Sequence, residues 1–362
     1  MSNKCALHCP YNSVSFGQVS TAITREIYRQ GLSPCIFPIG GQIDLNCQKK
    51  DPDFSLWLQS CLNRAHKHHN RNDTAIHLWH CNGLMESFSK EQVAITFLET
   101  DTCSETEANI LNQQKVTFVT SNFTKQVMEE AGVKNVKYLE LGFDKDNFYD
   151  TKKTYLNPDV IVFGLGGKLE ILRKAHEKVL KGWVKKYGNQ REYMLHAAIF
   201  NPFLRPEDQQ NILNNIFEGK RYWNVNLLPY MQTNSEYNDF INSVGIMLAL
   251  SRGEGRDLPV FHAVGLSKHC VGLRAHSYLD YLNNENATLI DPKSKIRAID
   301  NLFFHENPNW NTGNFFDWEE SDFLDACDVA VNKYKQNKIN AVGLELQKRT
   351  YKDTVETILK EV

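Results

Sequence analysis

Short apolar runs alternate with amphipathic stretches along this chain, and the alternation starts twice. In the first half, VAITFLET at 93–100 predicts a strand, and SFGQVSTAITREIYRQG at 15–31 predicts a helix that ends at its last glycine. The second half begins again with PDVIVFGLGGK at 158–168, an apolar run that ends in glycines. Strands that alternate with helices are typical of doubly wound sheets. The pattern therefore predicts an α/β fold with two Rossmann-like domains.

The length of the chain also favours two domains. A single hydrophobic core seldom serves as many as 362 residues. We predict an N-terminal domain over residues 1–155 and a C-terminal domain over residues 156–345, with the boundary near Tyr155–Pro158. The two domains are expected to face each other across a cleft. The helical end at 346–362 is expected to pack back on the first domain.

Composition limits the classes of partner. Charged residues make up 23% of the chain and the formal net charge is −2, so no strong overall attraction to nucleic acid or to an acidic membrane is expected. No apolar run reaches the roughly 18 residues of a membrane-spanning helix. The nine cysteines are odd in number and lack a C-x-x-C pair, and no signal peptide is visible. A cytoplasmic, reduced protein is the expectation.

Charge gathers immediately before an apolar helix in SRGEGRDLPVFHAVGL at 251–266. Asp257 can cap that helix, and Pro259 suits its first turn, where a missing N–H costs little. Glu254 then lies on a loop just ahead of a helix N-terminus. Such loops commonly bind anions and polar ligands, so this segment is a candidate ligand site.

A second candidate follows the strand at 158–168. GLGGK at 164–168 matches neither the phosphate-loop pattern nor the dinucleotide pattern, because Leu169 stands where each requires another residue. Lys168, Arg173 and Lys174 nevertheless cluster at the start of the predicted helix at 169–188. Ligands of open α/β sheets bind outside the carboxyl ends of strands, and three cations there can hold a diphosphate. The alternative is a flexible turn with a solvated lysine.

The histidines allow two interpretations. The segment HKHHN, with His66, His68 and His69, is a candidate metal site. No second cluster of ligands follows at a suitable spacing, so a solvated helix end is favoured and no metal site is predicted. His77 and His80 lie at the end of a predicted strand. A hydrogen-bonded core histidine is the alternative for both, and His80 is the better candidate for a ligand cleft.

Four segments, in chain order, resemble one family. They are an opening glycine loop and helix at 12–31, VTSNFTKQVMEEAGVKNVKYLELGFDKDNF at 119–148, GKLEILRKAHEKVLKGW at 167–183 and SRGEGRDLPVFHAVG at 251–265. The last is similar to a signature of a glutamate, a loop, Leu-Pro and a second glutamate. With these segments the chain resembles, over roughly residues 8–345, the two-domain GT-B glycosyltransferases, most closely retaining glycosyltransferase family 4.

The resemblance implies a role for each matching residue. The N-terminal domain would take the acceptor and the C-terminal domain the nucleotide sugar. Glu254 would hydrogen-bond the donor sugar, and His80 would lie near the transferred sugar, so these two are the catalytic candidates. The donor-binding candidates are Gly17 in the first loop, the cations Lys168, Arg173 and Lys174, the backbone of Arg256, Asp257 and Leu258, and His262.

One position departs from the family pattern. His262 stands where the second glutamate, which would bind ribose hydroxyls, is expected. A neutral imidazole accepts a hydrogen bond through only one nitrogen, so donor affinity and nucleotide identity are open. A milder departure is Ala175, which replaces the glycine expected after Arg-Lys.

The expected activity is transfer of a sugar from a nucleotide-diphosphate donor such as UDP-glucose or GDP-mannose, with retention. Fixed cations and helix N–H groups would stabilise the leaving diphosphate, so neither a metal nor another cofactor is expected. The acceptor stays open among a saccharide, a lipid, a protein and a modified nucleic acid. The alternatives are a GT-B nucleotide-sugar epimerase and a non-catalytic nucleotide-sugar-binding protein.

Overall fold

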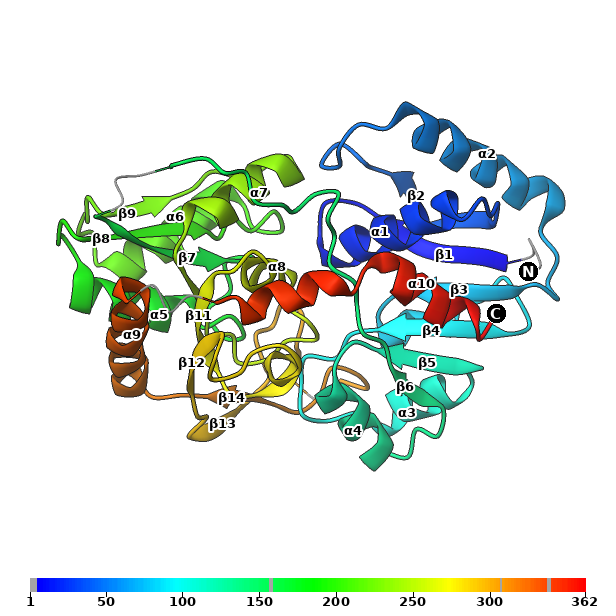
Figure 1. Ribbon diagram of the computed structural model, residues 1–362. Coiled ribbons are helices and arrows are strands. Elements are labelled where there is room, and N and C mark those ends of the chain that lie inside the picture. Colours follow the sequence, from blue (N-terminus) through cyan, green and yellow to red (C-terminus); the bar gives the residue numbers. More distant parts are fainter. Residues whose placement is uncertain (1–4, 156–158, 307, 337–339) are drawn as a thin grey trace. The chain divides into compact units, whose positions relative to one another are not determined.

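The computed structural model describes residues 5–155, 159–306, 308–336 and 340–362. The chain divides into two compact units (Figure 1). Unit 1 comprises Met1–Asn147, Asn307–Gly313 and Arg349–Val362, and unit 2 comprises Phe148–Glu306 and Asn314–Lys348. The predicted boundary near Tyr155–Pro158 falls partly on residues 156–158, which lie outside the described residues.

Unit 1 is built on a parallel six-stranded sheet in the order β2-β1-β3-β4-β5-β6. The predicted strands are present, and the helix α3 is an addition that the sequence interpretation missed. Its signal was the capping box formed by Ser104 and Glu107. The elements are β1 (Cys5–Tyr11), α1 (Ser15–Arg29), β2 (Cys35–Ile43), α2 (Pro52–His68), β3 (Thr74–Leu78), η1 (Cys81–Gly83), β4 (Gln92–Thr96), α3 (Glu105–Asn112), β5 (Val116–Val119), α4 (Asn122–Glu130), β6 (Val136–Tyr138) and α10 (Tyr351–Leu359).

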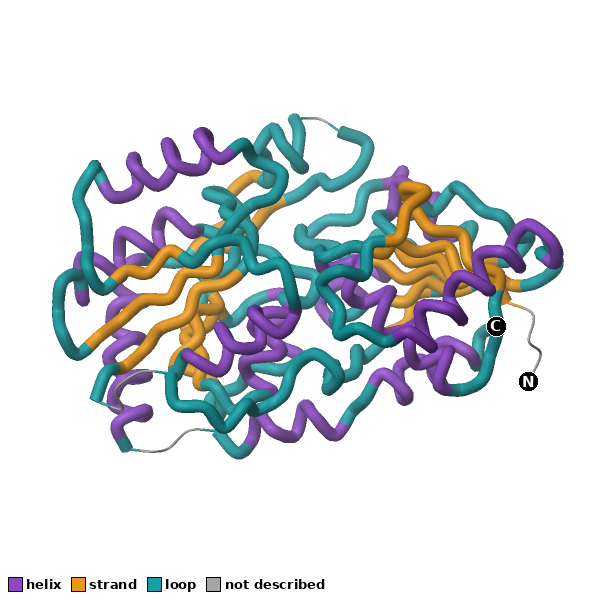
Figure 2. The backbone as a smooth tube through the Cα atoms, turned by 90° about the horizontal axis from the view of Figure 1, so that it is seen from above, coloured by secondary structure: helices purple, strands orange, loops and turns teal. Residues whose placement is uncertain are grey.

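Unit 2 repeats this architecture with a second parallel sheet in the order β12-β11-β10-β7-β8-β9, whose strands run side by side in Figure 2. It adds an antiparallel hairpin, β13 with β14, that the sequence interpretation did not predict. The elements are β7 (Ile161–Gly166), α5 (His176–Tyr187), β8 (Tyr193–Ala198), α6 (Pro206–Phe217), β9 (Val225–Leu227), α7 (Asn234–Ser243), β10 (Ile246–Ala249), α8 (Leu258–Gly265), β11 (His269–Leu273), η2 (His276–Asp280), β12 (Ala287–Ile290), β13 (Ser294–Arg297), β14 (Asn314–Asp317), α9 (Glu320–Lys335) and η3 (Val342–Lys348).

The predicted helix at 169–188 is wrong over residues 169–175, almost two turns. The helix α5 begins only at His176, because Ala175 adopts a left-handed conformation with φ 54°. Val179, Leu180 and Trp183 on this helix are then fully buried, as the 3.6-residue period requires. Lys168, Arg173 and Lys174 therefore lie on the loop between β7 and α5, rather than on the helix itself.

The end of the chain belongs to unit 1. There α10 packs on α1, and the backbone N–H of Phe143 donates to the carbonyl of Arg349 at 2.9 Å. The N–H of Gly142 donates to Thr354 Oγ1, also at 2.9 Å. A side chain at Gly142 would overlap with the backbone of Thr350, so glycine is required for this close approach. The C-terminal segment is thus fixed to the segment that follows β6.

Two further features bear on the composition-based expectations. All nine cysteines lie within the described residues, and each is a buried thiol. Among the helices of the described residues, none has both the length and the apolar character needed to cross a bilayer.

Candidate functional site

Two loops of unit 2 meet at one edge of its sheet. The strands β7 and β10 are parallel neighbours, with Ile246 opposite Phe163, so their carboxyl ends lie side by side. The loop after β7 carries Lys168, Arg173 and Lys174, and the loop after β10 carries residues 250–257. The loops are joined directly, because the N–H of Arg252 donates to the carbonyl of Arg173 at 2.7 Å. This contact brings the two candidate motifs of the sequence together.

Glu254 lies at the centre of these loops and is buried. Its Oε1 accepts hydrogen bonds from Ser251 Oγ at 2.6 Å and from Arg173 Nη1 at 2.9 Å. The ammonium of Lys174 lies 2.5 Å from the same oxygen. Burial disfavours the charged carboxylate, but Lys174 and Arg173 outweigh that effect and lower the pKa of Glu254 to about 2. The side chain is therefore an anion at neutral pH.

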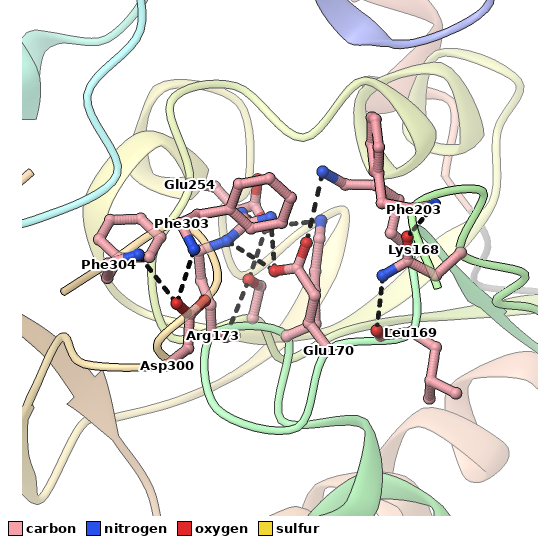
Figure 3. Close-up of polar contacts among 12 residues, drawn as sticks. Lys168, Leu169, Glu170, Arg173, Phe203, Glu254, Asp300, Phe303 and Phe304 are labelled. Carbon is pink, nitrogen blue, oxygen red and sulfur yellow. Dashed lines mark hydrogen bonds and ion pairs between the residues drawn. The ribbon is translucent and has the colours of Figure 1, made fainter. Parts of the chain in front are cut away.

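A second buried acid, Glu170, completes the ion-pair network that Figure 3 shows. Its Oε2 lies 2.9 Å from Arg173 Nε and 2.8 Å from Arg173 Nη2, and its Oε1 lies 3.4 Å from Lys168 Nζ. The N–H of Glu170 in turn donates to His176 Nδ1 at 3.3 Å. The sequence interpretation missed Glu170, although its i, i+3 spacing from Arg173 was a signal.

Asp257 lies where the sequence predicts the start of the helix α8, with Pro259 in the first turn. Its side chain does not cap the helix, because the residue is left-handed with φ 54°. The carboxylate instead accepts a hydrogen bond from Tyr278 Oη at 2.7 Å and lies 3.6 Å from Lys174 Nζ. Burial raises the pKa of Asp257, and Lys174 offsets part of that effect. The predicted position is confirmed, and the predicted capping bond is wrong.

Arg256 and Leu258 flank Asp257 and are also buried. The guanidinium of Arg256 lies 4.3 Å from the ring centroid of Phe261 and 5.2 Å from that of Tyr281. The carbonyl of Arg256 accepts a hydrogen bond from Tyr281 Oη at 2.8 Å. These contacts hold the backbone between Glu254 and α8 in one conformation.

His262 lies on α8, one turn from its start, and only 4% of it is exposed. Its ring is stacked on that of Phe148, with 3.8 Å between centroids and 16° between planes. Burial, with a smaller contribution from the Arg256 charge, lowers the pKa of His262 to about 3. The imidazole is therefore neutral at pH 7 and packs as an aromatic side chain.

The remaining two candidates belong to unit 1. His80 is exposed, precedes η1 and packs its ring 4.4 Å from the centroid of Phe16. Gly17 lies in the first turn of α1 and not in the loop before it. A Cβ at Gly17 would overlap with the backbone of Asn12, so local packing already requires a glycine here. The ligand roles of both residues stay predictions.

The other histidines singled out in the sequence lie in two kinds of surroundings. His77 is fully buried, with its ring centroid 4.1 Å from that of His8 on the neighbouring strand. His66 and His68 are exposed at the end of α2. Within the described residues, no group of three or more His, Cys, Asp or Glu side chains is placed to hold a metal ion.

The two sheets define the fold class: an α/β protein with two Rossmann-like doubly wound domains, as in the GT-B fold. No protein-family model and no curated protein sequence matches the chain. Solved structures do. Sucrose-phosphate synthase from Thermosynechococcus elongatus is similar with a TM-score of 0.69 and 9% identity, over 98% of this chain and 97% of that one.

Two further structures show the same likeness. Anabaena HepE in complex with UDP-glucose has a TM-score of 0.64 and 11% identity, over 99% of this chain and 98% of that one. The pneumococcal O-GlcNAc transferase GtfA in complex with UDP and GlcNAc has a TM-score of 0.57 and 12% identity, over 85% and 60% of the two chains. The likeness confirms the predicted two-domain Rossmann-like fold.

Proposed function

We propose that this protein is a glycosyltransferase that moves a sugar from a nucleotide-diphosphate sugar to an acceptor. The observation that carries the proposal is the convergence of Lys168, Arg173 and Lys174 with Glu254 at the carboxyl ends of β7 and β10. The named complexes of HepE with UDP-glucose and of GtfA with UDP and GlcNAc support a nucleotide-sugar donor for a chain of this fold.

The three cations would act on the leaving group. Breaking the glycosyl–phosphate bond builds negative charge on the diphosphate, and fixed positive charges lower the energy of that state. Each of the three cations faces a buried carboxylate: Lys168 faces Glu170, Arg173 faces Glu170 and Glu254, and Lys174 faces Glu254 and Asp257. These acids hold the cations in place until a diphosphate competes for them. The same cations supply the positive charge that a metal would otherwise supply, so the proposed transfer is metal-independent.

Glu254 would hold the donor sugar. In the described part of the chain, every polar contact of its side chain ends on Oε1. Oε2 is therefore left to accept a hydrogen bond from a sugar hydroxyl. Because the two cations keep Glu254 ionised, it would be a charged acceptor throughout the reaction. Retention of configuration, the His80 contact with the transferred sugar and the Gly17 approach to the diphosphate are parts of the same proposal.

One observation favours a second candidate, a non-catalytic nucleotide-sugar-binding protein. His262 replaces a family glutamate and is stacked on Phe148, so it offers the ribose no carboxylate. Turnover of any nucleotide sugar by the purified protein, with free UDP or GDP as a product, would exclude this candidate.

The test combines binding with product detection. Lys168→Ala and Lys174→Ala should each weaken UDP or GDP binding by about 1–3 kcal/mol, the scale of a charge-assisted bond. Isothermal titration would measure this, after a thermal-shift screen with UDP, GDP, UDP-glucose and GDP-mannose. Lys181→Ala is the control, since Lys181 pairs with Glu177 on the exposed face of α5. Equal nucleotide binding by all three variants would reject the phosphate role of these lysines.

A further inference from the structure

Lys168 is held differently from the other cations of the candidate site. Arg173 and Lys174 have side chains no more than 8% exposed and lie 2.9 and 2.5 Å from a buried carboxylate oxygen. The side chain of Lys168 is 29% exposed, and its ammonium lies at the longer distance of 3.4 Å from Glu170. Lys168 is therefore the most accessible of the three cations to an incoming anion.

Two aromatic rings lie against the same ammonium group. The Lys168 Nζ is 5.0 Å from the ring centroid of Phe203 and 4.6 Å from that of Phe303 (Figure 3). The two rings contact each other edge to face at 5.9 Å. Phe203 is 54% exposed, so much of its ring surface is open to solvent beside the ammonium group.

Hydrogen bonds fix the loop that carries each of the two rings. The N–H of Phe203 donates to Asn201 Oδ1 at 3.0 Å, and Asn201 Nδ2 donates to the carbonyl of Leu169 at 3.0 Å. Asn201 is fully buried, so it ties the turn after β8 to the residue next to Lys168. The loop after β13 is fixed similarly, because Asp300 Oδ1 accepts from three successive N–H groups, those of Leu302, Phe303 and Phe304.

An aromatic face attracts a cation through its quadrupole and carries no net negative charge. Glu170 already offsets part of the Lys168 charge at 3.4 Å, and a second carboxylate in place of the rings would offset more of it and repel a phosphate. Ring faces thus suit a lysine that must be oriented and must still bind an anion. Lys168 is thus held by two rings and one longer ion pair with Glu170, whereas Arg173 and Lys174 each pair closely with Glu254.

We propose that Phe203 and Phe303 form an aromatic clamp that positions the Lys168 ammonium for the donor diphosphate. The clamp rests on the proposed function, because a diphosphate is the anion that it serves. Both phenylalanines are positioning residues: they act through Lys168 and are not required to touch the nucleotide.

The first test is a double-mutant cycle on UDP binding. Phe203→Leu and Phe303→Leu keep an apolar side chain and remove the ring, and each should weaken UDP binding about two- to fivefold. Tyrosine at either position should restore binding, since it keeps the ring. In a Lys168→Met background the leucine changes should have no further effect. An equal loss in that background would overturn the clamp, because the rings would then contact the nucleotide themselves.

The second test needs no nucleotide. Reductive methylation with ¹³C labels lysine amines, and the Lys168 signal is identified by its loss in Lys168→Arg. Ring currents should move this signal upfield in the wild type, and Phe203→Leu and Phe303→Leu should each move it back. A signal that neither change moves overturns the clamp. A moved signal in a protein that binds neither UDP nor GDP would instead reject the proposed function and, with it, the diphosphate role of the clamp.

Discussion

At the scale of single residues, Glu254 has two separable effects. It compensates Arg173 and Lys174 in a buried site, and it is the proposed acceptor for a sugar hydroxyl. The charge compensation contributes to the stability of the fold, and the hydrogen bond to the sugar would contribute to turnover. A substitution that keeps the shape and removes the charge should therefore change both, and should leave the site more positive for a diphosphate.

We predict that Glu254→Gln lowers the free energy of unfolding by about 3 kcal/mol, because it leaves buried cations undercompensated. Turnover of an active donor should fall about 10²-fold or more, while UDP binding survives. Urea denaturation, steady-state kinetics and calorimetry measure the three quantities. Glu177→Gln is the matched control, since its pair with Lys181 is solvent-exposed and should contribute little. Full turnover by Glu254→Gln with every active donor would refute the catalytic assignment.

At the scale of elements, the first turn of α1 contains a glycine that either local packing or ligand binding could require. The proposed role of Gly17 is an approach to the diphosphate, whereas the observed constraint is the neighbouring backbone of Asn12. Glycine inside a helix costs up to about 1 kcal/mol relative to alanine, so alanine is favoured wherever it fits. Where a methyl group meets fixed backbone, overpacking of about 1–3 kcal/mol outweighs that gain.

Gly17→Ala should therefore destabilise the protein by about 1–2 kcal/mol, as measured by thermal or urea denaturation without ligand. The control is Gly182→Ala in α5, where a new Cβ would meet a side chain, the ring of Phe323 at 3.0 Å, and not fixed backbone. That change should destabilise the protein less than Gly17→Ala does. A Gly17→Ala protein of undiminished stability with weakened UDP binding would show that the ligand, and not Asn12, requires this glycine.

At the scale of the whole molecule, buried neutral histidines link stability to pH. Burial lowers the pKa values of His77, His176 and His262 to about 3, and those of His269 and His276 to about 4. The ordinary value of 6.5 applies to the unfolded chain, which therefore binds protons first as the pH falls. The stabilising contribution of each histidine is complete above pH 6.5 and decreases between pH 6.5 and the folded pKa.

The free energy of unfolding should accordingly be lower at pH 5 than at pH 7, by up to about 2 kcal/mol for each of these histidines. His262→Phe keeps an aromatic ring on Phe148. It should reduce the slope of the free energy of unfolding against pH by the equivalent of up to one bound proton. His66→Gln, at an exposed position, should leave it unchanged. Urea titrations at half-unit pH steps would measure the slopes. Equal stability at pH 5 and pH 7 would contradict the assignment of these residues as buried and neutral.

The sequence by itself predicted what depends on local pattern. The strand–helix alternation led to two Rossmann-like sheets, since apolar period and turn residues act within a few neighbours. The start of α8 at Asp257 and Pro259 was predicted for the same reason. The capping box of Ser104 and Glu107 was equally local, and it would have revealed α3 had it been used.

Only the tertiary structure decided which groups meet across distant segments. The partnership of Glu254 with Arg173 spans two loops some 80 residues apart, and no local pattern fixes such a distance. The left-handed turn at Ala175 moved Arg173 and Lys174 from a predicted helix to a loop, because long-range ion pairs outweigh the helical preference of residues 169–175. The stacking of His262 on Phe148 likewise depends on packing, which brings together residues that the sequence keeps far apart.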